Sequence, residues 1–304
     1  MKESASPLVS TPSLYVVATP LGNMGDLTPR ARDTLAAVDV VAAEDTRHSQ
    51  RLLDAHGVRA RLLAVHQHNE QEAAGQIIAL LAQGKQVALI TDAGTPAISD
   101  PGARLVVRVR EAGHPVVPVP GACAAIAALS VAGIVEGGFR FVGFLPTRTA
   151  ARRAALQALA GERNALVFYE APHRVRECVA DMAAVFGDER ELFVARELTK
   201  LHEELATMPL GAALAWFDAD ANRLRGEFVL IVHGAPAAAG LDAAAIRTLD
   251  LLLAELPLKT AVRLAAEITG AARNGLYSHA LAKRQCDNLT PQPDKHTKKT
   301  NDHP

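Results

Sequence analysis

Three loops rich in glycine and proline follow apolar runs of the sequence, at residues 19–23, 91–96 and 119–124. Glycine lets the backbone approach a ligand closely, and ligands of open α/β sheets bind beyond the carboxyl ends of the strands. The loops offer backbone donors and acceptors and one carboxylate, Asp92, which favours a ligand with an aromatic ring and a positive or neutral body over a triphosphate. The alternative is that these residues only form strand-to-helix turns, with Asp92 bracing one of them.

A second set of segments combines carboxylates with arginine, lysine or histidine, at residues 43–48, 66–70, 169–174, 196–200 and 225–227. Each segment alone is typical of surface ion pairs or helix caps, whereas five at the ends of predicted strands favour a shared cleft. His66 and His68 alternate on an extended segment and point to opposite faces, so they cannot easily share a metal ion and no metal site is expected. Either histidine is a candidate general base or a structural residue.

Residues 148–176 are rich in arginine, in a chain whose formal net charge is only −1. Arg148, Arg152 and Arg153 begin a predicted helix, where the helix dipole disfavours cations. Contact with phosphate is therefore favoured over a solvated helix face.

Apolar runs at residues 14–19, 38–43, 87–91 and 116–119 predict buried parallel strands in βαβ order. Thr28-Pro29, Asp100-Pro101 and Asn69 mark the starts of helices between them. Glycines and Pro146 interrupt this pattern at residues 136–146 and predict a hinge.

A second α/β series follows, with strands expected at residues 165–169, 191–195, 202–207 and 227–233 and helices at about 149–160, 172–186 and 209–217. The two middle strands adjoin without room for a helix, so this sheet is predicted to be mixed. Three further helices are expected near residues 243–255, 258–268 and 272–282.

The predicted organisation is a disordered arm at 1–13, an α/β lobe at 14–135, a hinge at 136–146, a second lobe at 147–234, a linker at 235–240, a helical domain at 241–282 and a disordered tail at 283–304.

Composition excludes several classes of protein. The near-neutral charge argues against a global polyanion-binding field. Three dispersed cysteines argue against a disulfide framework or thiolate zinc site and favour the cytoplasm. No signal peptide or membrane span is expected, and the glycine fingerprints of dinucleotide and nucleotide triphosphate sites are missing.

Taken in order, the loops and clusters closely resemble the bacterial ribosomal RNA small subunit methyltransferase I family. The resemblance covers about residues 14–234 and includes Thr19-Pro-Leu-Gly-Asn, Ala43-Glu-Asp-Thr-Arg, Asp92-Ala-Gly-Thr-Pro, Phe168-Tyr-Glu-Ala-Pro-His-Arg, Arg196-Glu-Leu-Thr-Lys and Arg225-Gly-Glu. It implies two α/β lobes of tetrapyrrole methylase type, S-adenosylmethionine in the cleft between them, a small C-terminal helical domain and a homodimer. The implied reaction is methylation of the ribose 2′-hydroxyl of a cytidine in the decoding region of 16S rRNA, within the small ribosomal subunit.

The resemblance also implies roles for individual residues. The third loop usually reads Pro-Gly-Pro, and alanine at position 122 predicts a looser turn there. Expected to bind the methyl donor are Pro20, Gly22, Asp92, Gly94, Thr95, Pro120, Gly121, Ala122 and Tyr169. Expected to contact RNA are Arg148, Arg152, Arg153 and Arg174. The catalytic candidates, left unranked, are Glu44, Asp45, Arg47, His68, Glu170 and Lys200.

Other functions remain as alternatives. A methylase of a tetrapyrrole precursor would share the fold but needs a roomier and less basic substrate cleft. A ribosome-assembly factor that binds RNA without catalysis would not need the intact donor loops. A nicotinamide dehydrogenase is disfavoured by the missing glycine fingerprint.

Overall fold

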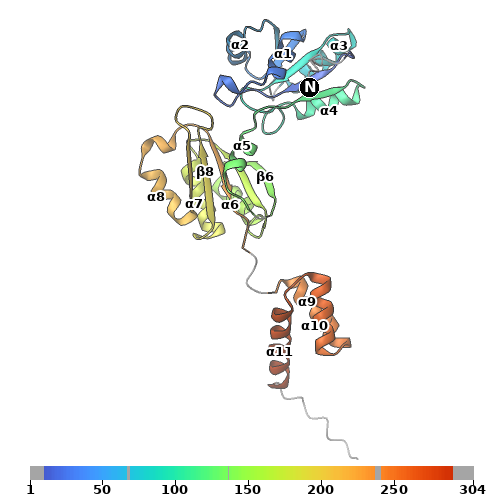
Figure 1. The fold of residues 1–304 in the computed structure, drawn as a ribbon, viewed down its shortest axis with the longest axis vertical. Helices are drawn as coiled ribbons and strands as arrows, with labels where there is room; N and C mark the ends of the chain where they lie inside the picture. The colour runs from blue at the N-terminus through green and yellow to red at the C-terminus, as the bar shows by residue number, and fades with distance from the viewer. Residues whose placement is uncertain (1–9, 67–68, 136, 237–240, 290–304) are drawn as a thin grey trace, which may run out of the picture. The chain divides into compact units, whose positions relative to one another are not determined.

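The computed structural model of the chain describes residues 10–66, 69–135, 137–236 and 241–289. The chain divides into two compact units, Met1–Ala235 and Pro236–Pro304. The first unit contains two five-stranded sheets and the second is helical (Figure 1). In the described part of the chain, the helices are too short or too polar to cross a membrane.

The first sheet is entirely parallel, with strand order β3-β2-β4-β1-β5. Its three central strands are buried because helices cover both faces, whereas the edge strands β3 and β5 are partly exposed. Helices α1 (Pro29–Ala37) and α2 (Thr46–Ala55) cover one face, and α3 (Glu70–Ala82) and α4 (Ala103–Glu111) cover the other. The four predicted parallel strands are confirmed, and β3 joins them. The strands are β1 (Leu14–Val17), β2 (Val40–Ala43), β3 (Arg61–Ala64), β4 (Val87–Ile90) and β5 (Val116–Val119).

The helix starts follow the sequence signals in part. Thr28 caps α1 by accepting a hydrogen bond from the Ala31 amide at 3.1 Å, with proline in the first turn. Asp100 does not cap α4, whose first residue is Ala103. Instead, one carboxylate oxygen of Glu70, on α3, accepts hydrogen bonds from the amides of residues 102, 104 and 105 at 3.0 to 3.2 Å. A residue distant in sequence therefore provides this cap and leaves Asp100 for another role.

The second sheet has strand order β6-β7-β10-β8-β9, and only β6 and β7 run parallel. The predicted mixed sheet is confirmed. Helices α6 (Thr149–Gln157), α7 (Val175–Phe186) and α8 (Leu210–Asp218) pack on one face, and α5 (Ala124–Val131) packs on the other. The strands are β6 (Phe139–Phe144), β7 (Ala165–Glu170), β8 (Glu191–Arg196), β9 (Glu204–Pro209) and β10 (Phe228–Val232). Two short 3₁₀ turns, η1 (Met24–Asp26) and η2 (Ala221–Leu224), complete the unit.

Two expected boundaries between the lobes are wrong. The segment assigned as a hinge contains β6, and Gly143, with φ +74°, lies where the register of β6 shifts against β7. The glycine therefore marks a β-bulge instead of a hinge. Helix α5, assigned to the first lobe, buries Ala125 and Ala128 against the second sheet. Short apolar helices carry no sequence signal for which of two sheets they will cover.

The second unit is a three-helix cluster of α9 (Ala243–Glu255), α10 (Leu258–Thr269) and α11 (Arg273–Leu289) with its own small core. Helix α11 continues through residue 289, so a tail starting at residue 283 is wrong for residues 283–289. Lys283 lies 2.8 Å from a carboxylate oxygen of Asp250, an ion pair that joins α11 to α9. The rest of the expected tail, and residues 1–9 of the expected arm, lie outside the described residues.

Candidate active site

The three glycine and proline loops meet at the carboxyl edge of the first sheet. The Thr19 amide donates to the Gly94 carbonyl at 2.9 Å, and the Gly94 amide donates back to the Thr19 carbonyl at 3.0 Å. The Thr95 hydroxyl donates to the Ala122 carbonyl at 2.9 Å. Loops that follow β1, β4 and β5 are thus joined to one another, and the carbonyl of the unusual Ala122 is held by Thr95.

Glycine is required at two points of this junction. Gly94 has φ +83°, a conformation that side chains disfavour. A Cβ on Gly121 would lie 2.8 Å from the Cβ of Ala18, so a side chain does not fit there. The missing side chains therefore let these loops pack closely against one another and against Ala18.

Carboxylates surround the end of β4. Asp92 accepts a hydrogen bond from the Asp45 amide at 3.2 Å, which links the loops after β2 and β4. Glu44 accepts a hydrogen bond from the Thr91 hydroxyl at 2.9 Å. Burial raises the pKa of Glu44, and the neighbouring Asp100 and Asp92 add to this, while the Thr91 hydrogen bond partly offsets it. Burial likewise raises the pKa of Asp100.

Residues of both sheets line one cavity of about 430 Å³. The Tyr169 hydroxyl accepts a hydrogen bond from the Ala125 amide at 3.0 Å, and Phe144 packs edge-on against its ring at a centroid distance of 5.8 Å. Burial raises the pKa of Tyr169, so the phenol stays protonated. The cavity therefore combines aromatic surface with carboxylates. Its charged and aromatic lining includes Glu44, Asp92, Asp100, Phe144, Tyr169, Glu170, Glu227 and Phe228.

Lys200 lies in an adjoining cavity of about 360 Å³, which Asp92 and Glu227 also line. Its ammonium group donates to carboxylate oxygens of Glu197 at 2.8 Å and Glu227 at 2.9 Å. Burial opposes ionisation of Lys200, but these two hydrogen bonds outweigh it and raise the pKa of the lysine. A Cβ on Gly22 would lie 2.6 Å from Cγ of Lys200, so the lysine from the second lobe rests directly on the first loop.

The backbone around Lys200 is strained. Glu197 has φ +53° and Thr199 has φ +66°, conformations that non-glycine residues rarely adopt. A Cβ on Gly226 would lie 2.5 Å from Cγ of Glu197, so only glycine leaves room for that side chain. Glu197 and Glu227 were not among the expected site residues. Their signal was present in the dense charged motifs at 196–200 and 225–227, but sequence alone does not show that the two motifs converge.

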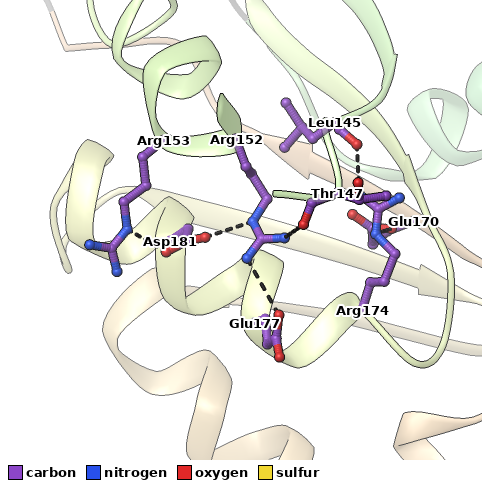
Figure 2. Close-up of polar contacts among 8 residues, drawn as sticks. All are labelled: Leu145, Thr147, Arg152, Arg153, Glu170, Arg174, Glu177 and Asp181. Carbon is purple, nitrogen blue, oxygen red and sulfur yellow. Dashed lines mark hydrogen bonds and ion pairs between the residues drawn. The ribbon is translucent and has the colours of Figure 1, made fainter. Parts of the chain in front are cut away.

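Glu170 and Arg174 form a buried pair. One Glu170 oxygen lies 3.2 Å from Nε of Arg174, while Nη2 of Arg174 donates to the Leu145 carbonyl at 2.6 Å (Figure 2). The other Glu170 oxygen is buried and has no hydrogen-bond partner among the described residues. Arg174 is thus held inside the lobe by Glu170 and Leu145, and its expected contact with RNA stays a prediction. The Glu170 side chain is fully buried, and its carboxylate lies against Arg174 and Cys178.

Arg152 was expected to contact RNA, and this is wrong. Its side chain is 2% exposed and donates to Asp181 at 2.6 Å, with further contacts to the Thr147 carbonyl and Glu177 (Figure 2). Arg153 reaches the other oxygen of Asp181 at 2.6 Å but remains half exposed. The unfavourable helix dipole at the start of α6 is offset because Asp181 on α7 supplies a carboxylate to both arginines.

The remaining candidates lie in different surroundings. Asp45 caps α2 by accepting from the amides of Arg47 and His48, and these hydrogen bonds lower the pKa of the carboxyl. The Arg47 side chain is 91% exposed, and Arg148 is also exposed. His68 lies outside the described residues. Pro20 and Gly22 line the Lys200 cavity, and Pro120 is exposed at the loop junction.

The fold defines a class of protein. The family of Tetrapyrrole (Corrin/Porphyrin) Methylases matches residues 13–214. A cobalt precorrin-4 methyltransferase has the same fold, with a TM-score of 0.56 at 17% identity over 73% of this chain and 94% of that one. A uroporphyrin-III C-methyltransferase of Thermus thermophilus, solved with S-adenosyl homocysteine, has a TM-score of 0.53 at 19% identity. That match covers 73% of this chain and 97% of the other. The chain is thus a methyltransferase of tetrapyrrole methylase type.

Sequence relatives narrow this class. Ribosomal RNA small subunit methyltransferase I of Pseudomonas aeruginosa is 52% identical over 91% of this chain and 99% of the relative. The enzyme of the same name from Escherichia coli O157:H7 is 50% identical over 93% of this chain and 100% of the relative. The family RsmI C-terminal HTH domain matches residues 239–284. The chain therefore belongs to the ribosomal RNA small subunit methyltransferase I family.

Proposed function

We propose that this protein transfers a methyl group from S-adenosylmethionine to the ribose 2′-hydroxyl of a cytidine in the decoding region of 16S rRNA. The observation that carries this proposal is the identity of about half the residues, over nearly the full length, with enzymes named for methylation of small subunit RNA. The fold alone would serve a tetrapyrrole methylase equally well, since those structures share it at 17 to 19% identity.

The site fits the methyl donor. Gly94 and Gly121 let the loops that follow β1, β4 and β5 meet at the edge of the first sheet, and Tyr169 provides aromatic surface in the neighbouring cavity. Glu44, Asp92 and Asp100 supply the negative charge that a sulfonium and an ammonium group require. When bound, S-adenosylmethionine supplies an electrophilic methyl group, and the protein contributes orientation and desolvation.

The protein must also remove the proton of a weakly acidic ribose hydroxyl. A carboxylate with a raised pKa is a better general base than one with an ordinary pKa, because its pKa is closer to the pH at which the enzyme works. Glu44 meets this condition, whereas the Glu170 side chain is fully buried and paired with Arg174. Asp45 does not, since its amide contacts stabilise the ionised form. We assign Glu44 as the base and Lys200 as the cation that stabilises the developing oxyanion.

The proposed substrate sets the cellular context. The enzyme acts in the cytoplasm, where the small ribosomal subunit is assembled, and its target strand is single-stranded because a ribose must leave a helix to enter a cavity. We propose that it works as a homodimer. Exposed apolar side chains on α5 (Ile126, Val131) and on the edge strand β6 (Phe139, Phe144) supply a surface for a second copy.

Transfer of label from methyl-tritiated S-adenosylmethionine tests this function. Small ribosomal subunits that lack the modification, protein-free rRNA and a tetrapyrrole precursor are assayed in parallel, and the labelled nucleotide is mapped. Label on a cytidine ribose is the expected result. Label on the tetrapyrrole alone would replace the proposal with small-molecule methylation, and cofactor binding without any transfer to RNA would contradict it.

A further inference from the structure

Helix α2 carries two like charges one turn apart, and the first of them lies in a position that a helix disfavours. Arg47 lies in the first turn, where the helix dipole opposes a cation, and Arg51 follows four residues later, so the two like charges are neighbours on one face. Both side chains are exposed. Such an arrangement lowers the stability of the helix unless another group compensates for it.

The rest of the protein provides little compensation. Arg47 has one weak ion pair, at 3.8 Å to Asp45, whose carboxylate already accepts two backbone amides. Asp54, the acid on the next turn, accepts from the Gln50 amide group at 2.8 Å. Within the described part of the chain, Arg51 has no ion pair or side-chain hydrogen bond. Arg152 and Arg153, by contrast, each form a close ion pair with the carboxylate of Asp181.

The two arginines border the cavity that holds Lys200. His48 and Leu52, on the adjacent side of α2, line that cavity together with Gly22 and Lys200. A chain of phosphates that crosses Arg47 and Arg51 would therefore pass directly beside the cavity. Guanidinium groups suit phosphate because their planar donors match two of its oxygens.

We propose that Arg47 and Arg51 form a docking ridge for the phosphate backbone of the RNA strand, and that this ridge positions the target ribose at the Lys200 cavity. The inference rests on the RNA methylation proposed above and assigns the RNA-binding surface to α2 in place of Arg152. Arg47 acts on the substrate backbone, outside the cavity where the chemistry occurs.

The test compares Arg51→Gln and the double variant Arg47→Gln/Arg51→Gln with the wild-type protein. Each is assayed for methyl transfer to small subunits at several salt concentrations, for anisotropy of a labelled single-stranded RNA, and for binding of S-adenosylmethionine by calorimetry. Arg108→Gln is the matched control, since Arg108 is an exposed arginine on α4, which covers the opposite face of the same sheet.

The double variant should raise KM for the RNA substrate by about tenfold or more, with kcat at saturating RNA and cofactor affinity within about twofold of wild type. Loss of two phosphate contacts should reduce the magnitude of the slope of log affinity against log salt by about 1.4. Arg51→Lys, which keeps the positive charge, should restore most of the slope and affinity that Arg51→Gln loses. The control should change neither quantity.

Wild-type KM and salt slope in the double variant would overturn the ridge, as would a fall in kcat with KM unchanged. The proposed function fails separately. A wild-type protein that binds RNA through α2 without methylating it would contradict methylation and leave the ridge standing. Methylation of RNA that is indifferent to the α2 variants would contradict the ridge alone.

Discussion

Lys200 shows how single residues shape this site. Its ammonium group is held between Glu197 and Glu227, and its aliphatic chain rests on the bare backbone of Gly22. Gly226 in turn leaves room for Glu197. The lysine thus depends on two glycines from opposite lobes, neither of which contacts a substrate through a side chain. A small side chain at either position should disturb the chemistry before it disturbs the fold.

Gly22→Ala should lower methyl transfer by about tenfold or more while changing the unfolding free energy by less than about 1 kcal/mol, because the flexible lysine chain moves away from the new methyl group. Gly75→Ala is the control, since a Cβ there meets nothing within 4 Å and alanine favours the α3 helix. Activity and urea unfolding are measured on both variants. Full activity in Gly22→Ala would show that the position of Lys200 is unimportant.

Glu44→Gln should reduce kcat by about 10²-fold or more and remove the acidic limb of its pH profile. Wild-type activity should fall as pH drops through the raised pKa of Glu44, since the base acts only when ionised. Thr91→Val removes a hydrogen bond that lowers this pKa, so its acidic limb should move to higher pH. An unchanged profile in Glu44→Gln would contradict the assignment of Glu44 as the base.

The stability of the folded protein gives an independent test of the raised pKa of Glu44. The folded protein holds the Glu44 proton more tightly than the unfolded chain, so the contribution of this residue to stability decreases as pH rises from about 4.5 through the raised value. Glu44→Gln should therefore be more stable than wild type at pH 8 and lose that advantage near pH 4. Thermal unfolding across this range measures the difference.

At the scale of elements, helices are fixed by polar contacts from neighbouring segments as well as by apolar packing. Glu70 on α3 caps α4, and Asp181 on α7 holds Arg152 and Arg153 on α6. Arg190 similarly donates to the carbonyls of residues 160, 162 and 233 and so ties the end of the second sheet to the loop after α6. Each contact joins residues far apart in sequence.

Asp181→Asn should destabilise the first unit by about 3 to 5 kcal/mol, because it leaves the buried Arg152 charge without its partner. The double variant Arg152→Met/Asp181→Leu should recover most of the loss, and Arg153→Gln, which changes the half-exposed partner, should cost about 1 kcal/mol or less. Urea unfolding at pH 7 measures all three. Equal losses in Arg153→Gln and Asp181→Asn would contradict this division.

The pH dependence of this pair has the opposite sign to that of Glu44. Burial alone would raise the pKa of Asp181, but hydrogen bonds from Arg153 and Arg152 outweigh it and lower the pKa. The stabilisation is therefore present above about pH 3.8 and is lost as pH falls through the lowered value. Acid unfolding of Asp181→Asn should show a shallower dependence on pH in this range than wild type.

At the scale of the whole molecule, the two units have separate cores. Four apolar clusters lie within Met1–Ala235, and one lies among α9, α10 and α11. The loop junction and both cavities of the site belong to the first unit. Cofactor binding should therefore not require the second unit.

A variant that ends at Ala235 should bind S-adenosylmethionine with an affinity within about twofold of the full chain, measured by calorimetry. Its thermal unfolding checks that the first unit folds without the second. A large loss of affinity in a folded variant would show that the helical unit takes part in the donor site.

The sequence by itself determined the local features: four of the five parallel strands of the first sheet, the Thr28 cap and the three glycine and proline loops. These depend on residues adjacent along the chain, so hydrophobic periodicity and turn chemistry reveal them. The resemblance to a known family, based on motif order, supplied the chemistry.

Only the tertiary structure decided which charges are free. Arg152 lies in the first turn of α6, and Arg51 lies one turn from the like charge of Arg47, yet Arg152 has a buried carboxylate partner and Arg51 has no ion-pair partner among the described residues. The same applies to α5, whose apolar surface suits either sheet, and to Lys200, whose partners Glu197 and Glu227 come from separate motifs. Contacts between distant segments follow from the packing of the whole unit, which local sequence patterns do not encode.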